Sequence, residues 1–352
     1  MTIQQGFKML KKISLLSLLT LALMAEDNFI QSQYTSLKQG STQDQVISLF
    51  GKAEHKEGFL EGDLDIEAGF TLNGVLKKSS TLNFFNNLND YDLLIHQLSA
   101  NYYVDNSTMV SVGRENMNLN LLNGSFDGAL VATSFDDFFL KAFYFKHYAY
   151  LVPTLYQHAE LDGLSGLSLN YSKDWFDSEF SYINENSEHR STLYLGFLNK
   201  PYKAGIEHMQ FISPTRSNER AYKLHAGMKV KHFYAETGFI DVYDGQLQNI
   251  YAFGGSEFNA FGLTSFLNNK NAQNGYLDMI YNHKPLYTKL HLGQTNFDFG
   301  SSSYLGKELG LTVGYRYKDF HTTLQSMTQK SDQVGFFGNR TSWVHTNLEY
   351  RF

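Results

Sequence analysis

The sequence predicts an all-β chain that forms a transmembrane antiparallel β-barrel of about 18 strands, with about 16 as the alternative. Three features support this prediction: a final segment that alternates between apolar and polar residues, an early segment with acids along one face, and connections that alternate in length. The composition agrees, because 23 Tyr, 29 Phe and 28 Gly accompany only 4 Pro in 352 residues, and aromatic residues favour strands.

The final segment reads TSWVHTNLEYRF. Successive side chains of a strand point to opposite faces. Leu348 and Tyr350 therefore share a face that suits hydrocarbon, whereas His345 and Glu349 share a face that suits water. Phe352 ends the chain on an aromatic residue, which is typical of the last strand of an outer-membrane barrel. The alternative is the edge strand of a soluble β-sandwich.

An export signal opens the chain. Three lysines precede the apolar run 13–24, and Ala25 and two acids follow it. This is the pattern of a secretory signal peptide. The run is too short for a convincing membrane span. We therefore expect residues 1–25 to be removed and the mature chain to leave the cytoplasm.

The segment 26–57 differs from the rest of the chain. Ser41 and Asp44 have the spacing of a capping box, and apolar residues follow at helical spacing as far as Gly51. This pattern predicts a short helix in a periplasmic N-terminal segment. We expect the helix to pack under or inside the mouth of a barrel formed by residues 58–352.

From residue 58 the hydrophobic period becomes two. One face of this strand is apolar and includes Leu64 and Ile66. The other face carries four acids, Glu61, Asp63, Asp65 and Glu67. Burying unpaired carboxylates in a packed core is prohibitive, so this face is predicted to line a lumen that contains water.

Tight, lysine-marked connections alternate with longer polar ones. The tight set is Lys173-Asp174, Lys200-Pro201, Lys231-His232, Lys284-Pro285 and Lys318-Asp319. The longer set lies at 184–189, 213–219, 268–274, 296–304 and 329–339. Outer-membrane barrels have short periplasmic turns and longer extracellular loops. The strand count made on this basis needs a strand at 246–254 mainly for parity, and it places 79–88 in the first loop.

The link 147–163 is the third outer loop in this count. It carries three polar residues, His158, Glu160 and Asp162. Porins typically fold their third loop inward, so this link is predicted to form the constriction of the channel. The alternative is a loop that lies on the outer rim.

Residues 110–134 contain a V-G-R motif followed by F-x-G. The positions are Val112, Gly113, Arg114, Phe126, Asp127 and Gly128. This stretch resembles the OprD-type porins, and with the signal peptide, the strand count and the terminal Phe the resemblance spans roughly 58–352. It implies an outer-membrane channel for small polar solutes, with an inward third loop and a row of basic side chains along the lumen. This chain is shorter and has few arginines where that row would lie.

Strand alternation assigns the residues that face the lumen. The predicted pore-lining set is Glu61, Asp63, Asp65, Glu67, Lys223, His225, Lys229, Lys289, His291, Arg316 and Glu349. Lysines at strand ends have an alternative, because they can extend to the headgroups, and Lys231 and Lys318 are expected to do so. The acidic strand and the basic strand at 220–231 are nine apart in this count, which would set opposed charges across the pore.

Cysteine is absent from the sequence, which excludes disulfides, Cys-ligated zinc and thiol catalysis. The sequence also lacks HExxH, G-x-S-x-G and phosphate-loop motifs, and it has no basic tract suited to nucleic acid. We therefore expect no enzyme activity, no cofactor, no metal site and no nucleic-acid partner.

The expected function is that of a porin in the outer membrane of a Gram-negative bacterium, a water-filled channel for passive diffusion of small hydrophilic solutes and ions. One alternative is a substrate-selective channel for small charged nutrients. Another is a plugged barrel that acts as an enzyme or an adhesin. The expected partners are outer-membrane lipid and lipopolysaccharide, periplasmic chaperones and the barrel-assembly machinery, and a homotrimer is left open.

Overall fold

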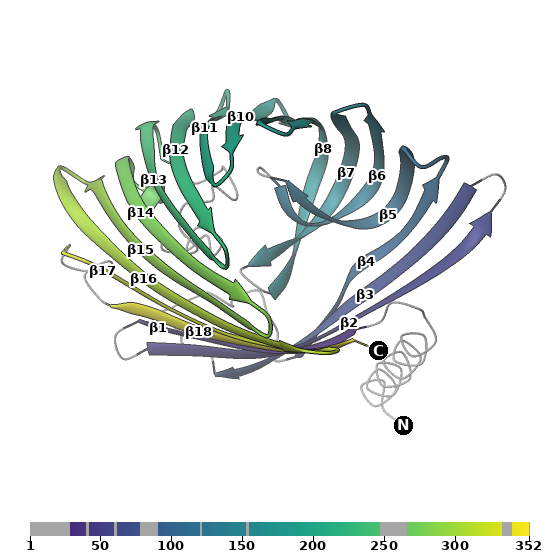
Figure 1. The fold of residues 1–352 in the computed structure, drawn as a ribbon, viewed down its shortest axis with the longest axis horizontal. Helices are drawn as coiled ribbons and strands as arrows, with labels where there is room; N and C mark the ends of the chain where they lie inside the picture. The colour runs from purple at the N-terminus through teal and green to yellow at the C-terminus, as the bar shows by residue number, and fades with distance from the viewer. Residues whose placement is uncertain are drawn as a thin grey trace.

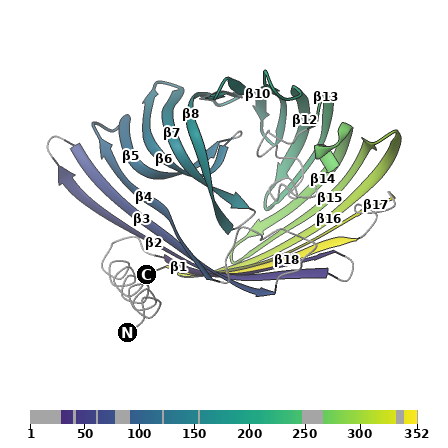
Figure 2. The ribbon, with the colours of Figure 1, turned by 180° about the vertical axis from the view of Figure 1, so that it is seen from behind.

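The wall of the protein is a single antiparallel sheet that closes on itself. The computed structural model describes residues 29–39, 42–59, 62–77, 91–119, 122–152, 155–246, 266–332 and 340–351. The sheet has 18 strands, and each strand pairs with its neighbours in the chain. The first strand, β1 (Phe29–Gln39), also pairs with the last, β18 (Thr341–Arg351), which completes the barrel (Figures 1 and 2).

The remaining elements follow in chain order. The first half contains β2 (Thr42–Phe59), β3 (Gly62–Lys77), β4 (Tyr91–Tyr103), β5 (Thr108–Leu119), β6 (Leu122–Phe135), β7 (Phe138–Val152), β8 (Leu155–Lys173) and β9 (Phe176–Glu185). The second half contains β10 (Glu188–Asn199), β11 (Tyr202–Ile212), β12 (Glu219–Val230), β13 (Phe233–Asp244), the 3₁₀ turn η2 (Phe266–Asn268), β14 (Lys270–His283), β15 (Leu286–Phe299), β16 (Ser302–Tyr317) and β17 (Phe320–Ser331).

The prediction of a helix within 26–57 is wrong for the described residues, because 29–39 and 42–59 are the strands β1 and β2. β2 pairs with β1 on one side and with β3 on the other. The physical reason is that closure of the sheet gives this segment backbone partners on both sides, which outweighs the local preference of one capping box. The barrel therefore starts before residue 58, and the signal peptide predicted at 1–25 lies outside the described residues.

The strand number of 18 is confirmed, but two of its members differ from the prediction. β1 and β2 are additional. β13 pairs directly with β14, so the wall has no strand between them, where the prediction needed one at 246–254. Residues 247–265 and 79–88 lie outside the described residues.

The connections at one end of the barrel, called the turn side here, span two to four residues each. The lysine-marked connections after β8, β10, β12, β14 and β16 each span two residues and are all found there. Lys231 and Lys318 have φ angles of 53° and 52°, the left-handed conformation that two-residue hairpin turns require. At the opposite end, the loop side, 186–187 and 300–301 are also two-residue turns. The longer links expected at 184–189 and 296–304 are therefore shorter than predicted.

The two faces of the wall differ in chemistry. Large apolar side chains are exposed on one face and polar side chains are buried on the other; in β3, for example, Ile66 is 44% exposed and Asp65 is 7% exposed. Side chains diverge on the convex face of a barrel and converge on its concave face. The exposed apolar rows therefore mark the outer face, and the buried polar rows mark the inner face. No helix among the described residues is long and apolar enough to cross a membrane.

The loop-side half of the inner face between β6 and β15 is mostly apolar, although Arg190 of β10 is buried beside the Phe211 ring and pairs with Glu185 at 2.8 Å (Nη2–Oε2). A cluster of buried side chains runs across these strands, and its fully buried members include Phe145, Leu164, Ile183, Met209, Phe211, Ala221 and Ile240. Side chains without solvent contact cannot border a water-filled channel. The inner face therefore divides into an apolar loop-side part and a polar part nearer the turn side.

The pairing of β1 with β18 can be tested by a cross-link, since the chain has no cysteine of its own. Thr35 and His345 are direct register partners and are hydrogen-bonded at 3.0 Å. Directly opposed strand residues lie within reach of a disulfide, so the double variant Thr35→Cys/His345→Cys should form one under oxidation. A shift in mobility on a non-reducing gel measures this. The offset pair Thr35→Cys/Leu348→Cys is the control, and equal cross-linking of both pairs would contradict the register.

Candidate functional site on the inner face of the barrel

Two charged walls lie across the barrel from each other. β3 and β12 are nine strands apart in a closed sheet of 18, so they occupy opposite sides. β3 carries Asp63, Asp65 and Glu67, and β12 carries Lys223, His225 and Lys229. The apolar neighbours Ile66 and Leu224 are each 44% exposed on the outer face, so alternation places the charged residues on the inner face. Glu61 lies outside the described residues.

The acidic wall contains lysines as well as carboxylates. Lys52 of β2 lies 2.7 Å (Nζ–Oε2) from Glu67, which also accepts a hydrogen bond from the Gln97 amide. Lys56 lies 2.8 Å (Nζ–Oε1) from Glu54 on the same strand. These lysines belong to the segment 26–57, which was expected to lie under or inside the mouth of the barrel and not in its wall. Their alternation along β2 is the signal that would have placed them beside β3.

The opposite wall also mixes both signs of charge. Lys223 stands directly across from Glu207 of β11, and its Nζ lies 5.6 Å from the centroid of the Tyr276 ring. His225 Nδ1 lies 3.4 Å from Glu236 Oε2, and the Tyr276 hydroxyl donates a hydrogen bond of 2.9 Å to Glu236 Oε1. Neighbouring strands thus hold each carboxylate beside a basic or hydroxyl group.

The same pattern continues across β14 to β17. Asp278 lies 3.3 Å from Lys289 Nζ and 2.5 Å from His291 Nδ1. The other ring nitrogen of His291 lies 3.7 Å from Glu308 Oε2, and Gln329 donates a hydrogen bond of 3.1 Å to Glu308 Oε1. This chain of contacts, with the Lys223 and His225 contacts before it, is called the charged ladder.

The ladder contains four acids that the sequence prediction missed. They are Glu207, Glu236, Asp278 and Glu308. Strand alternation could have found them, because the exposed outer residues Phe239 and Met279 fix the faces of β13 and β14. A wall of this kind presents carboxylate, ammonium and imidazole groups side by side. It can attract either end of a dipolar solute, but among the described residues no group of His, Asp and Glu is placed to hold a metal ion.

The last predicted residues of the set lie nearer the turn side. Lys229 and Arg316 are exposed on the inner face. Glu349 Oε1 accepts a hydrogen bond of 2.7 Å from Arg351 Nε and lies 3.8 Å from His321 Nδ1. These groups lie in the last turn-side residues of their strands, separate from the ladder.

The stretch 147–163 is not a loop, contrary to the prediction. Residues 147–152 of β7 pair with 160–155 of β8 in a continuous hairpin. A paired hairpin satisfies the backbone donors and acceptors that a long loop would leave open, which is the physical reason for the difference. His158, Glu160 and Asp162 belong to β8, and their side chains lie outside the described part of the chain. A role for them in a constriction stays a prediction.

Glycines make room for the rings of the ladder. A Cβ at Gly238 would overlap the Tyr276 ring, and a Cβ at Gly205 would overlap the His225 ring. These rings therefore lie flat against the inner wall, where both reach Glu236. The backbone of the wall is in this way part of the site.

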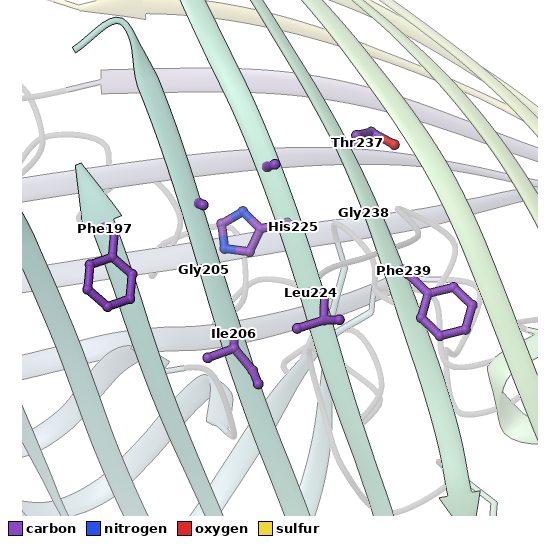
Figure 3. Close-up of a pocket in the computed structure, with 10 residues that line it drawn as sticks. Phe197, Gly205, Ile206, Leu224, His225, Thr237, Gly238 and Phe239 are labelled. Carbon is purple, nitrogen blue, oxygen red and sulfur yellow. The ribbon is translucent and has the colours of Figure 1, made fainter. Parts of the chain in front are cut away.

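A shallow hollow of about 500 Å³ lies on the other side of the same strands. Figure 3 shows it between Phe197 and Phe239, with Ile206 and Leu224 along it. These four side chains belong to the exposed apolar rows of the outer face. The hollow therefore opens away from the charged ladder and is not part of the candidate site.

The fit of Tyr276 on Gly238 can be tested by adding one methyl group. Gly238→Ala should lower the free energy of unfolding by about 1–3 kcal/mol, because overpacking forces the ring away from Glu236. Urea unfolding of the protein in detergent measures the change. Gly275→Ala on the neighbouring strand is the control, since nothing lies within 4 Å of the added Cβ. Equal stability of the two variants would contradict the packing described here.

No protein-family model and no curated protein matches the sequence. Solved structures do match in fold. OccAB2 of Acinetobacter baumannii is 13% identical, with a TM-score of 0.74 over 93% of this chain and 97% of that one. OccK3 (OpdO) of Pseudomonas aeruginosa is 13% identical, with a TM-score of 0.73 over 93% and 95%. The outer membrane protein opdK of Pseudomonas aeruginosa is 12% identical, with a TM-score of 0.70 over 93% and 98%.

At this level of identity the likeness concerns the fold. The match extends over nearly the whole chain, and it agrees with the resemblance that the V-G-R and F-x-G motifs carry. The chain therefore has the 18-stranded barrel fold of the OprD-type outer-membrane proteins.

Proposed function

We propose that the protein is an outer-membrane channel for small hydrophilic solutes. The observation that carries this proposal is the charged ladder on the concave face of a closed barrel whose convex face is apolar. A barrel of about 18 strands is wide enough to hold an aqueous path. Polar groups on its inner face give that path a favourable lining, and apolar groups on its outer face suit hydrocarbon.

The exposed aromatic residues support a membrane position. Trp175, Tyr202 and Phe233 are all 60–63% exposed and stand beside turn-side connections. Aromatic girdles of this kind mark the interfaces of outer-membrane barrels, and short turns mark their periplasmic end. This orientation places the turn side in the periplasm. Outer-membrane lipid, lipopolysaccharide, periplasmic chaperones and the assembly machinery are then the expected partners, and a homotrimer stays open.

Selection among solutes is favoured over a wide, unselective pore. The apolar cluster covers the loop-side half of the inner face from β6 to β15, so the aqueous path is expected to follow the polar part. Both walls carry carboxylates beside basic groups. A small solute with separated charges would find a partner on either wall, which supports the alternative of a substrate-selective channel for small charged nutrients.

Single-channel conductance tests the proposal as a whole. The purified, folded protein in a planar bilayer under a salt gradient should give discrete current steps, because ions follow the polar inner face. Heat-dependent mobility on a gel checks that the barrel is folded. A folded barrel that gives no steps would contradict the channel and favour a plugged barrel.

Charge reversal tests the electrostatic role of the β3 wall. Asp63→Lys/Asp65→Lys should shift ion selectivity toward anions, since it replaces two negative charges beside the path with positive ones. The reversal potential under a salt gradient measures the shift. Asp105→Lys, in the exposed turn after β4, is the control with a single reversed charge away from the inner wall. Unchanged selectivity in the double variant would argue against the opposed-wall model.

A further inference from the structure

The pairing of the sheet is interrupted along one line between β4 and β8, called the crease here. The ladder between β4 and β5 ends at the pair Leu98 and Arg114, although β4 continues to Tyr91. In β7, Lys146 is passed over in the ladders with both β6 and β8. β8 passes over 161–163 at the same level. The interruptions between β4 and β5, between β6 and β7, and between β7 and β8 thus lie close together, and the regular β5–β6 ladder joins them.

Glycines stand where the crease meets its two outer strands. Gly113 of β5 has a φ of 124° and Gly163 of β8 has a φ of 142°, a conformation that favours glycine. These bends separate the turn-side part of the wall from its loop-side continuation. That continuation consists of 114–119, 122–127, 147–152 and 155–160, and it is called the flap.

The flap folds out of the cylinder of the wall. β8 approaches β4, although β5, β6 and β7 lie between them in the sheet order. Strands spaced ~4.8 Å apart would keep β4 and β8 about 19 Å apart along an unbent wall. The approach therefore requires the loop-side part of the sheet to bend at the crease, so that β8 comes near β4. In Figure 1, β5 accordingly turns away from β4 and runs toward the middle of the ring of strands.

One arginine joins the flap to the wall at the crease. Arg114 Nε and Nη2 each donate a hydrogen bond of 2.5 Å to one oxygen of the Asp127 carboxylate on β6. Its Nη1 donates a hydrogen bond of 2.6 Å to the carbonyl oxygen of Ile95 on β4. The Ser125 hydroxyl donates to the next β4 carbonyl, that of His96. At Ile95 and His96, β4 has no backbone pairing with β5. The side chains of Arg114 and Ser125 therefore donate to these two carbonyl oxygens instead.

The arginine lies on the outer face rather than in the lumen. Leu98 stands directly opposite Arg114 and is 55% exposed, and Asp127 stands opposite it on the other side. Directly opposed residues of a ladder share a face. Arg114 and Asp127 therefore do not touch a solute on the inner face, and any effect on transport must pass through the flap.

We propose that the hydrogen bond from Arg114 to the Ile95 carbonyl on β4, oriented by the pairing of Arg114 with Asp127, is a latch that sets how far the flap stands into the channel. Arg114 and Asp127 are positioning residues, and their effect on transport rests on the proposed channel function. The chemistry suits this role, because a bidentate pair between guanidinium and carboxylate fixes both distance and angle. In apolar surroundings such a pair is weakly screened. Without it, the flap would move about the bends at Gly113 and Gly163.

Hydrogen–deuterium exchange of the full-length folded protein tests the latch. In Arg114→Met and in Asp127→Asn, amides of 115–119 and 122–127 should exchange at least about tenfold faster, since a hydrogen-bonded charged pair is lost. The exchange rates of amides 138–143, on the turn side of the crease, should not change. Lys173→Met is the matched control, because it removes an exposed turn-side ion pair with Asp137 of 3.2 Å. Arg114→Lys should give an intermediate rate, since an ammonium cannot span the same three acceptors.

Conductance of the same variants adds the functional readout. The unlatched variants should show altered step size and more frequent closures, whereas Lys173→Met should match the unaltered protein. Unchanged exchange in both Arg114→Met and Asp127→Asn would overturn the latch. If the unaltered protein gives no current, the channel proposal fails, and exchange still decides the latch. If Arg114→Met does not fold, Asp127→Asn and Arg114→Lys decide it.

Discussion

The structure depends on the closure of one backbone hydrogen-bond ladder. In hydrocarbon no water can satisfy a free N–H or C=O group, so a sheet can span a membrane only when its edges meet. Here the edges are β1 and β18, paired from Phe29 with Arg351 to Gln39 with Thr341. Once the ring is closed, every strand has an outer and an inner face, and the alternation of apolar and polar residues assigns each side chain to one of them.

Closure also brings charges from distant segments together. Lys52 and Glu67 meet because β2 and β3 are in register, and Asp278, His291 and Glu308 meet across three strands. Groups on a crowded inner face lose hydration and need partners, which explains why acids and bases alternate around the ring. The net field inside the barrel is then a small difference between opposed contributions. Lys229 and Arg316, near the turn side, form no ion pair with the residues that the structure describes, and such groups can set its sign.

At the flap the backbone hydrogen bonding of the wall is interrupted, and side chains supply donors in its place. β5 leaves β4 at the crease, and the carbonyl groups of Ile95 and His96 take side-chain donors instead. The residues involved overlap the V-G-R and F-x-G motifs that carry the resemblance to OprD-type porins. Gly113 supplies the bend, and Arg114 and Asp127 supply the pair. The bend and the ion pair therefore explain these two motifs without any contact with a solute.

The sequence by itself determined the period of the strands, the positions of the lysine-marked turns and the faces on which Asp63, Lys223 and their neighbours lie. These properties are local, since alternation and turn chemistry act over a few residues. The tertiary structure alone decided that 29–59 forms strands, because the partner of β1 is at the far end of the chain. It also decided that 147–163 is a hairpin, and that Lys52 stands beside Glu67. Register and closure are properties of the whole ring, and no single segment contains them.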